Sequence, residues 1–110
     1  MSENSPTARI LVADDERSIR WVLSEALTAD GHQVSEAATG TDALAILNRG
    51  ATDVAFLDIR MPDMNGLDVV SKAREAGCQS TLIVMTAQTT MANAVEAMKR
   101  GAYEYLIKPI

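Results

Sequence analysis

The chain has 110 residues, enough for one domain with a single buried core, and 47% of them are hydrophobic, as in ordinary globular domains. Its net charge of −5 argues against a domain that binds DNA or an acidic membrane by itself, and its single cysteine, Cys78, excludes an internal disulfide and fits a reducing compartment. No apolar run approaches the roughly 18 residues of a membrane-spanning helix, and residues 1–7 lack the apolar core of a signal peptide.

Five short apolar runs, bounded by polar or turn-forming residues, predict strands. They cover residues 9–13, 33–38, 54–58, 81–86 and 103–107. The runs at 9–13 and 54–58 are nearly continuous, which is typical of strands buried on both faces of a parallel sheet. The run at 33–38 has Val34 as its only strongly apolar residue, so we expect it at an edge of the sheet.

Four segments between the strands show the apolar periodicity of helices, and a glycine follows each one. The first segment predicts a single inward face formed by Ile19, Val22, Leu23, Ala26 and Leu27. Trp21 lies off this face, so we expect it to be at least partly exposed. Thr39 or Thr41 can cap the second helix, and the third is predicted over residues 66–75. The last segment carries four apolar residues at helical spacing, Met91, Ala94, Val95 and Met98, and its inner face is expected to be mostly alanine and methionine.

The alternation of strands and helices predicts an α/β fold with a parallel sheet and helices on both faces. Five strands fit the flavodoxin-like, doubly wound order 2-1-3-4-5, in which strands one and three flank the switch point. We expect residues 1–8 to form a flexible tail and residues 9–110 to form the domain. A further helix would normally cover the sheet beside the last strand. The sequence ends before such a helix, so either the polypeptide was cut there or the full protein continues.

Charged and hydroxyl side chains gather where the predicted strands end. Asp14 and Asp15 follow the first strand, Asp58 ends the third, Thr86 ends the fourth and Lys108 follows the fifth. In open α/β sheets this edge binds ligands, so Asp58 is a candidate nucleophile for a phosphoryl group. Three carboxylates about 5 Å apart would repel one another by roughly 3 kcal/mol per pair at an effective dielectric constant of about 20. Such a cluster favours a bound cation, and its hard oxygen ligands suit Mg²⁺.

These positions resemble the response-regulator receiver domains of two-component signalling, and the resemblance covers residues 9–110. The stretch 101–109 is similar to the NtrC group, whose receivers precede a sigma-54-activating ATPase and a DNA-binding domain. The resemblance implies a cytoplasmic phosphorylation switch that controls transcription, rather than an enzyme that turns over. A sensor histidine kinase would donate the phosphoryl group to Asp58. The domain itself would contact neither nucleic acid nor membrane, although it could form a dimer.

The resemblance also implies how the metal and the phosphoryl group are handled. Asp15 and Asp58 would bind Mg²⁺ directly, Asp14 would act mostly through water, and the backbone carbonyl of Arg60 would complete the protein ligands. The domain would promote its own phosphorylation and its slow dephosphorylation. The long polar side chains of Arg60 and Gln88 would flank the phosphoryl group and tune its lifetime.

The remaining matching residues would stabilise the phosphoryl group and transmit its presence. Lys108 would place a positive charge on the phosphoryl oxygens, Thr86 would donate a hydroxyl hydrogen bond, and the small Ala87 would leave room for the donor. Tyr105 would rotate after Thr86 moves, which would change the surface formed by the last helix and the last strand. The family also implies a cis peptide bond before Pro109.

Each of these residues also has an ordinary structural interpretation. Asp14 or Asp15 could be a helix N-cap, Asp58 a loop-start aspartate, Thr86 a β-branched strand residue and Lys108 a surface lysine. A flavin-binding protein of the same fold would need a hydroxyl- and glycine-rich phosphate loop where this chain is acidic. A phosphatase resembling the haloacid dehalogenases would need a second aspartate where this chain has an arginine. A metal-binding pseudo-receiver that never sees phosphate is the third alternative.

Overall fold

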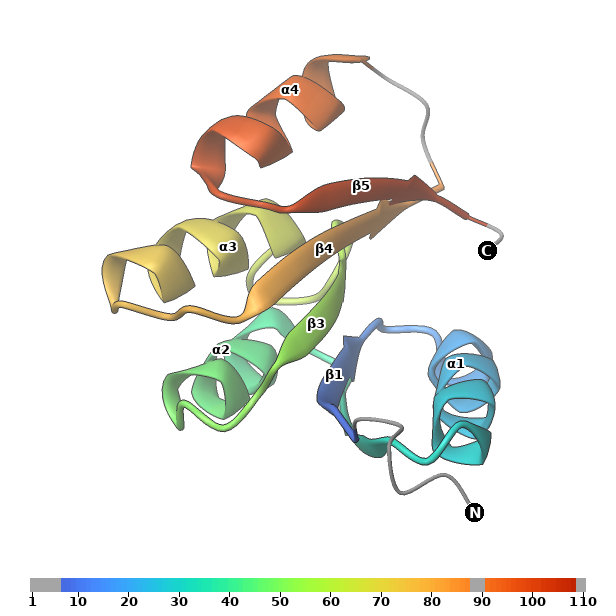
Figure 1. Cartoon of the computed structure of the whole chain (residues 1–110). Coiled ribbons are helices and arrows are strands. Elements are labelled where there is room, and N and C mark those ends of the chain that lie inside the picture. Colours follow the sequence, from blue (N-terminus) through green and yellow to red (C-terminus); the bar gives the residue numbers. More distant parts are fainter. Residues whose placement is uncertain (1–6, 88–90, 109–110) are drawn as a thin grey trace.

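The computed structural model describes residues 7–87 and 91–108, which contain five strands and four helices in strict alternation (Figure 1). In chain order the elements are β1 (Arg9–Ala13), α1 (Arg17–Ala29), β2 (Gln33–Ala37), α2 (Gly40–Asn48), β3 (Val54–Asp58), α3 (Gly66–Glu75), β4 (Thr81–Thr86), α4 (Met91–Arg100) and β5 (Glu104–Ile107). The predicted strand bounds are confirmed to within one residue, since β2 ends at Ala37 and β5 begins at Glu104.

The five strands form one parallel sheet in the order β2-β1-β3-β4-β5, which confirms the predicted flavodoxin-like topology. The weakly apolar β2 lies at an edge, as expected. At the centre, β1 and β3 are neighbours, and Ala13 pairs with Leu57. The residues that follow this pair, Asp14 and Asp58, therefore lie side by side at the carboxyl edge of the sheet.

The main core lies between the sheet and helices α2 and α3. Leu11, Ala55 and Leu82 are in register across the three central strands, and all three are fully buried. The helices contribute buried residues from their inner faces: Ala43, Leu47, Leu67, Val69, Val70 and Ala73. Of the two candidate caps for α2, Thr39 is the one used, because its Oγ1 accepts a 3.1 Å hydrogen bond from the amide of Asp42.

The opposite face of the sheet is covered by α1 within the described parts of the chain, while α2, α3 and α4 follow one another over the first face (Figure 1). Val12, Phe56 and Ile83 are in register across β1, β3 and β4 on this opposite face. Val12, on the strand that α1 contacts, is fully buried, whereas Phe56 and Ile83 are half-buried. This face is therefore only partly covered by the described residues.

The prediction of a single inward face on α1 was partly wrong. Three of its five residues are half-buried: Ile19, Leu23 and Leu27. Val22 is 55% exposed and Ala26 is also exposed, because the apolar stripe is wider than the contact that α1 makes with β1 and β2. Trp21 is 63% exposed, as its position off the stripe predicted. None of the described helices is both long enough and apolar enough to cross a membrane.

The inner face predicted for α4, mostly alanine and methionine, is confirmed for alanine but not for Met98, and Ala94 is half-buried. Ala97 is fully buried, whereas Val95 and Met98 are 45% and 48% exposed; the side chain of Met91 lies outside the described part of the structure. The fully buried residue of α4 is thus a small one, and its larger apolar residues Val95 and Met98 face outward. The Nη1 atom of Arg100 lies 2.9 Å from Oδ1 of Asp68 on α3, which forms an ion pair between the two helices.

Candidate functional site

A cavity of about 380 Å³ opens at the carboxyl edge of the sheet. Its lining comes from four strand ends and the loops that follow them: Asp15, Glu16, Asp58, Arg60, Thr86, Ala87 and Lys108. The sequence predicted six of these residues as parts of one site. The structure therefore brings together the candidate nucleophile, a candidate metal ligand, the hydroxyl and the lysine in a single cavity.

Asp58 ends β3 and is only 4% exposed. The chain folds back tightly behind it, since the amide of Gly66 donates a 2.9 Å hydrogen bond to the carbonyl of Ile59. A Cβ atom at Gly66 would overlap the backbone carbonyl of Asp58, so glycine is required for this close approach. Burial, and then the negative charges of Asp14 and Asp15, raise the pKa of Asp58 from 3.8 to about 6, although Lys108 opposes the shift.

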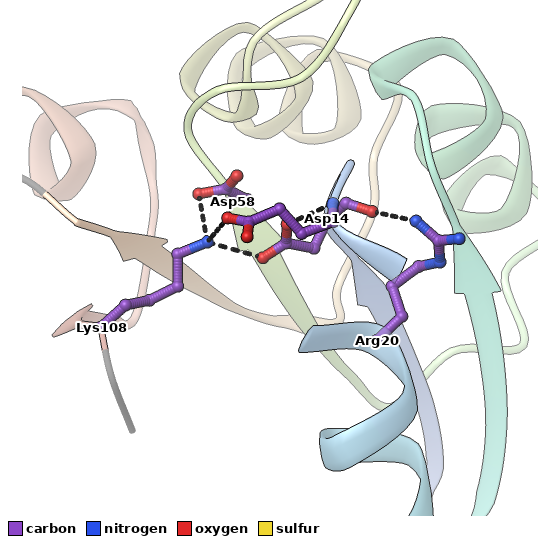
Figure 2. A network of polar contacts seen from close by, with 5 residues as sticks. Asp14, Arg20, Asp58 and Lys108 are labelled. Atoms are coloured by element: carbon purple, nitrogen blue, oxygen red, sulfur yellow. Dashed lines mark hydrogen bonds and ion pairs between the residues drawn. The ribbon is translucent and has the colours of Figure 1, made fainter. Parts of the chain in front are cut away.

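Lys108 reaches into the group of carboxylates (Figure 2). Its Nζ atom lies 2.8 Å from Asp14 Oδ2, 3.5 Å from Asp58 Oδ1 and 3.7 Å from Glu16 Oε1. Burial lowers the pKa of Lys108, but the hydrogen bond to Asp14 and the charges of Asp58, Asp14 and Glu16 outweigh this effect, so the pKa lies above its usual value. A permanent positive charge therefore lies where the crowded carboxylates need one.

Asp14 is fully buried, and its polar atoms are held on all sides. Its amide donates a 3.0 Å hydrogen bond to the carbonyl of Ala37 on β2. Its Oδ1 atom accepts a 2.9 Å hydrogen bond from the amide of Glu16, and its Oδ2 atom accepts the one from Lys108. The N-cap position of α1 belongs to Glu16, so the interpretation of Asp14 or Asp15 as the helix N-cap was wrong.

Among the described residues, Asp14, Asp15 and Glu16 form an acidic cluster in which one carboxylate oxygen from each residue lies within 4.8 Å of the other two. Asp15 and Glu16 are exposed at the cavity that Asp58 also lines. The exposed carboxylates of Asp15 and Glu16 are hard oxygen donors that a hydrated ion can reach from solvent, so they fit a divalent cation such as Mg²⁺. Sequence reasoning gave no role to Glu16, although its place in the run Asp14-Asp15-Glu16 was the available signal.

The predicted switch residues lie on neighbouring strands. Thr86 ends β4, is 3% exposed and lines the cavity. Tyr105 on β5 pairs with Val84, two residues before Thr86, and the half-buried Tyr105 packs against the core. Strand alternation therefore places both side chains on the same face of the sheet. Gln88 and the peptide bond before Pro109 lie outside the described residues.

The sequence of this chain matches known receivers over nearly its whole length. It matches the family model of the response regulator receiver domain over residues 10–110. It is 43% identical over 102 residues to the DNA-binding transcriptional regulator NtrC of Azospirillum brasilense, and the match covers 93% of this chain and 21% of that protein. The chain thus spans about a fifth of the length of this relative.

Solved structures show the same architecture. The chemotaxis protein CheY4 of Vibrio cholerae superposes with a TM-score of 0.88 at 32% identity, covering 96% of this chain and 89% of that one. A response regulator protein of Burkholderia pseudomallei, solved with a phosphorylated aspartic acid, a calcium ion and citrate, superposes with a TM-score of 0.86 at 26% identity, covering 94% of this chain and 61% of that one. The family match, the strand order and the acidic cavity lead to one conclusion: this chain belongs to the response regulator receiver domain family, and its sequence is NtrC-like.

Proposed function

We propose that this receiver domain accepts a phosphoryl group on Asp58 in the presence of Mg²⁺ and thereby controls an output. The observation that carries the proposal is the shared cavity: the buried Asp58 carboxylate faces the same space as Asp15, Thr86 and Lys108. The phosphorylated aspartic acid and bound calcium ion of the Burkholderia pseudomallei relative support the same chemistry here.

The residues present would hold Mg²⁺ through the carboxylates of Asp15 and Asp58, with Asp14 acting through water and the backbone carbonyl of Arg60 completing the protein ligands. The bound ion would neutralise charge on the incoming phosphate. Glu16 also offers a carboxylate within the acidic cluster, so we add it as a candidate ligand or a water-holding residue.

In the reaction, an oxygen of the ionised Asp58 carboxylate attacks phosphorus, and the bond from phosphorus to the donor breaks as the new O–P bond forms. With its pKa at about 6, Asp58 is mostly ionised at neutral pH. Lys108, which contacts both Asp14 and Asp58, would then donate to the phosphoryl oxygens. The Thr86 hydroxyl would donate a further hydrogen bond from the end of β4.

The donor in the cell is proposed to be a sensor histidine kinase, and the output to be transcription through ATPase and DNA-binding domains in a longer protein. The DNA-binding transcriptional output follows from the NtrC relative, of which the chain covers about a fifth, whereas the kinase and the ATPase domain follow from the family resemblance of the sequence. Movement of Thr86 toward the phosphoryl group, followed by Tyr105, would alter the surface of α4 and β5. We propose that the domain is a cytoplasmic switch with slow self-dephosphorylation. We do not propose a phosphatase with multiple turnovers, because Arg60 occupies the position where such an enzyme would have its general acid.

Incubation of the 110-residue chain with Mg²⁺ and acetyl phosphate, followed by intact mass measurement, tests this function. The chain should gain the mass of one phosphoryl group, and a chelator or Asp58→Asn should prevent the gain. Asp63→Asn is the matched control, because Asp63 is exposed in the loop after β3 and should not affect phosphorylation. Mg²⁺ binding without any gain in mass would instead identify a pseudo-receiver.

A further inference from the structure

We propose that Arg20 is a positioning residue for the acidic cluster: it fixes the peptide unit between Asp14 and Asp15 and so sets the direction of the Asp15 carboxylate. This inference rests on the proposed function, since it concerns how the chain holds Mg²⁺. Arg20 lies on the opposite side of Asp14 from Lys108 (Figure 2).

Two contacts of the Arg20 guanidinium carry this inference. Its Nη1 atom donates a 2.7 Å hydrogen bond to the backbone carbonyl of Asp14, and its Nε atom lies 3.3 Å from Oε1 of Glu36 on β2. The side chain of Arg20 is only 16% exposed. Arg20 therefore joins three elements, because it sits on α1, contacts the end of β1 and pairs with β2.

The carbonyl that Arg20 holds belongs to the peptide unit that leads into Asp15. On the other side of Asp14, its amide is fixed to the carbonyl of Ala37, the residue next to Glu36. With both peptide units around Asp14 held, the chain cannot rotate there without breaking a hydrogen bond. Asp15 is exposed, so packing does little to fix its side chain. The direction of its carboxylate therefore depends on the backbone that these two hydrogen bonds hold.

The geometry requires an arginine in particular. A guanidinium can donate to a carbonyl and a carboxylate at once in a fixed plane, whereas an ammonium acts as a single point charge. Arg20 is also a cation near an acidic cluster, so its charge alone would oppose the binding of Mg²⁺. Positioning and charge therefore predict opposite signs for the effect of removing Arg20 on Mg²⁺ affinity.

Calorimetric titration of MgCl₂ into the whole chain separates these effects. Arg20→Met should raise the Kd for Mg²⁺ by roughly ten-fold, the range found when groups that orient metal ligands are removed. Arg20→Lys should show a smaller increase, because an ammonium can still donate to the Asp14 carbonyl, although without the fixed plane of the guanidinium. Glu36→Gln should also show a smaller increase. Arg17→Met is the matched control, because Arg17 is exposed on the same helix and its loss should leave the Kd unchanged or lower it.

Phosphorylation by acetyl phosphate provides a second readout. At limiting Mg²⁺ the Arg20→Met variant should react more slowly than the parent, and saturating Mg²⁺ should restore its rate. A Kd for Arg20→Met that is equal to or lower than that of the parent would overturn the inference. Should this variant fail to fold in a urea titration, an unchanged Kd in both Arg20→Lys and Glu36→Gln would overturn it equally. If the parent itself neither binds Mg²⁺ nor gains phosphate, the proposed function fails together with the inference.

Discussion

Removing the charge of Asp58 should stabilise the metal-free protein. The pKa of this buried carboxyl rises from 3.8 to about 6, and a shift of about two units corresponds to roughly 3 kcal/mol of penalty on the ionised form. Asp58→Asn removes this penalty but also loses the 3.5 Å contact with Lys108 and leaves a polar group buried. We therefore expect the free energy of unfolding to rise by about 1–2 kcal/mol at neutral pH.

The pH dependence of this effect has a definite sign. Between pH 3.8 and about 6 the folded state binds more protons at Asp58 than the unfolded state does. The free energy of unfolding should therefore fall as pH rises through this window, and the penalty should be fully present above it. In the Asp58→Asn variant, the free energy of unfolding should lack this fall with rising pH. The stabilities of parent and variant should therefore differ least near the acid end of the window.

Urea titrations in EDTA at several pH values measure both quantities. Asp63→Asn is the control, because hydrogen bonds from Thr41 lower the pKa of the exposed Asp63 and its replacement should give no stabilisation. Adding Mg²⁺ should stabilise the parent more than the Asp58→Asn variant. An Asp58→Asn variant that is less stable than the parent in EDTA would show that favourable hydrogen bonds, not repulsion, dominate at Asp58.

Three further outcomes are expected. Gly66→Ala should lower the free energy of unfolding by about 1–3 kcal/mol in urea titrations, because the new Cβ would overlap the Asp58 carbonyl, whereas Ser71→Ala in the same helix should not. Replacing Arg60 or Gln88 should change the phosphate half-life several-fold while phosphorylation still occurs, and unchanged half-lives in both variants would remove them from the site. Amide hydrogen exchange over residues 89–105 should change when a phosphate mimic is added. The same measurement is made on a chain extended by a further helix, and equal exchange with and without the mimic there would place the switch elsewhere.

Much of the fold could be predicted because its signals are local. The runs at 9–13 and 54–58 are apolar up to the residue where each strand ends, and their bounds were confirmed. Helix faces were harder to predict, since periodicity shows which residues are apolar but not which neighbours cover them. Val22 and Met98 satisfied the helical pattern, yet both are about half exposed because of how α1 and α4 meet the rest of the chain.

The candidate site shows the same division. Asp58 and Lys108 could be placed at one edge because parallel strands bring their ends together. The 2.8 Å contact between Lys108 and Asp14, 94 residues apart, and the link from Arg20 to the Asp14 carbonyl depend on side-chain directions that spacing does not reveal. The expectation that the carboxylates need a cation was accordingly incomplete, because Lys108 already supplies one positive charge.

The most direct test of the central claim is to identify which residue carries the phosphoryl group. After reaction with acetyl phosphate and Mg²⁺, borohydride reduction converts a phosphorylated aspartate to homoserine, which peptide mass spectrometry locates. We expect homoserine at position 58 and at no other aspartate. Homoserine at position 14 or 15, or a stable phosphate on serine or threonine, would contradict the assignment of Asp58 as the phosphoacceptor.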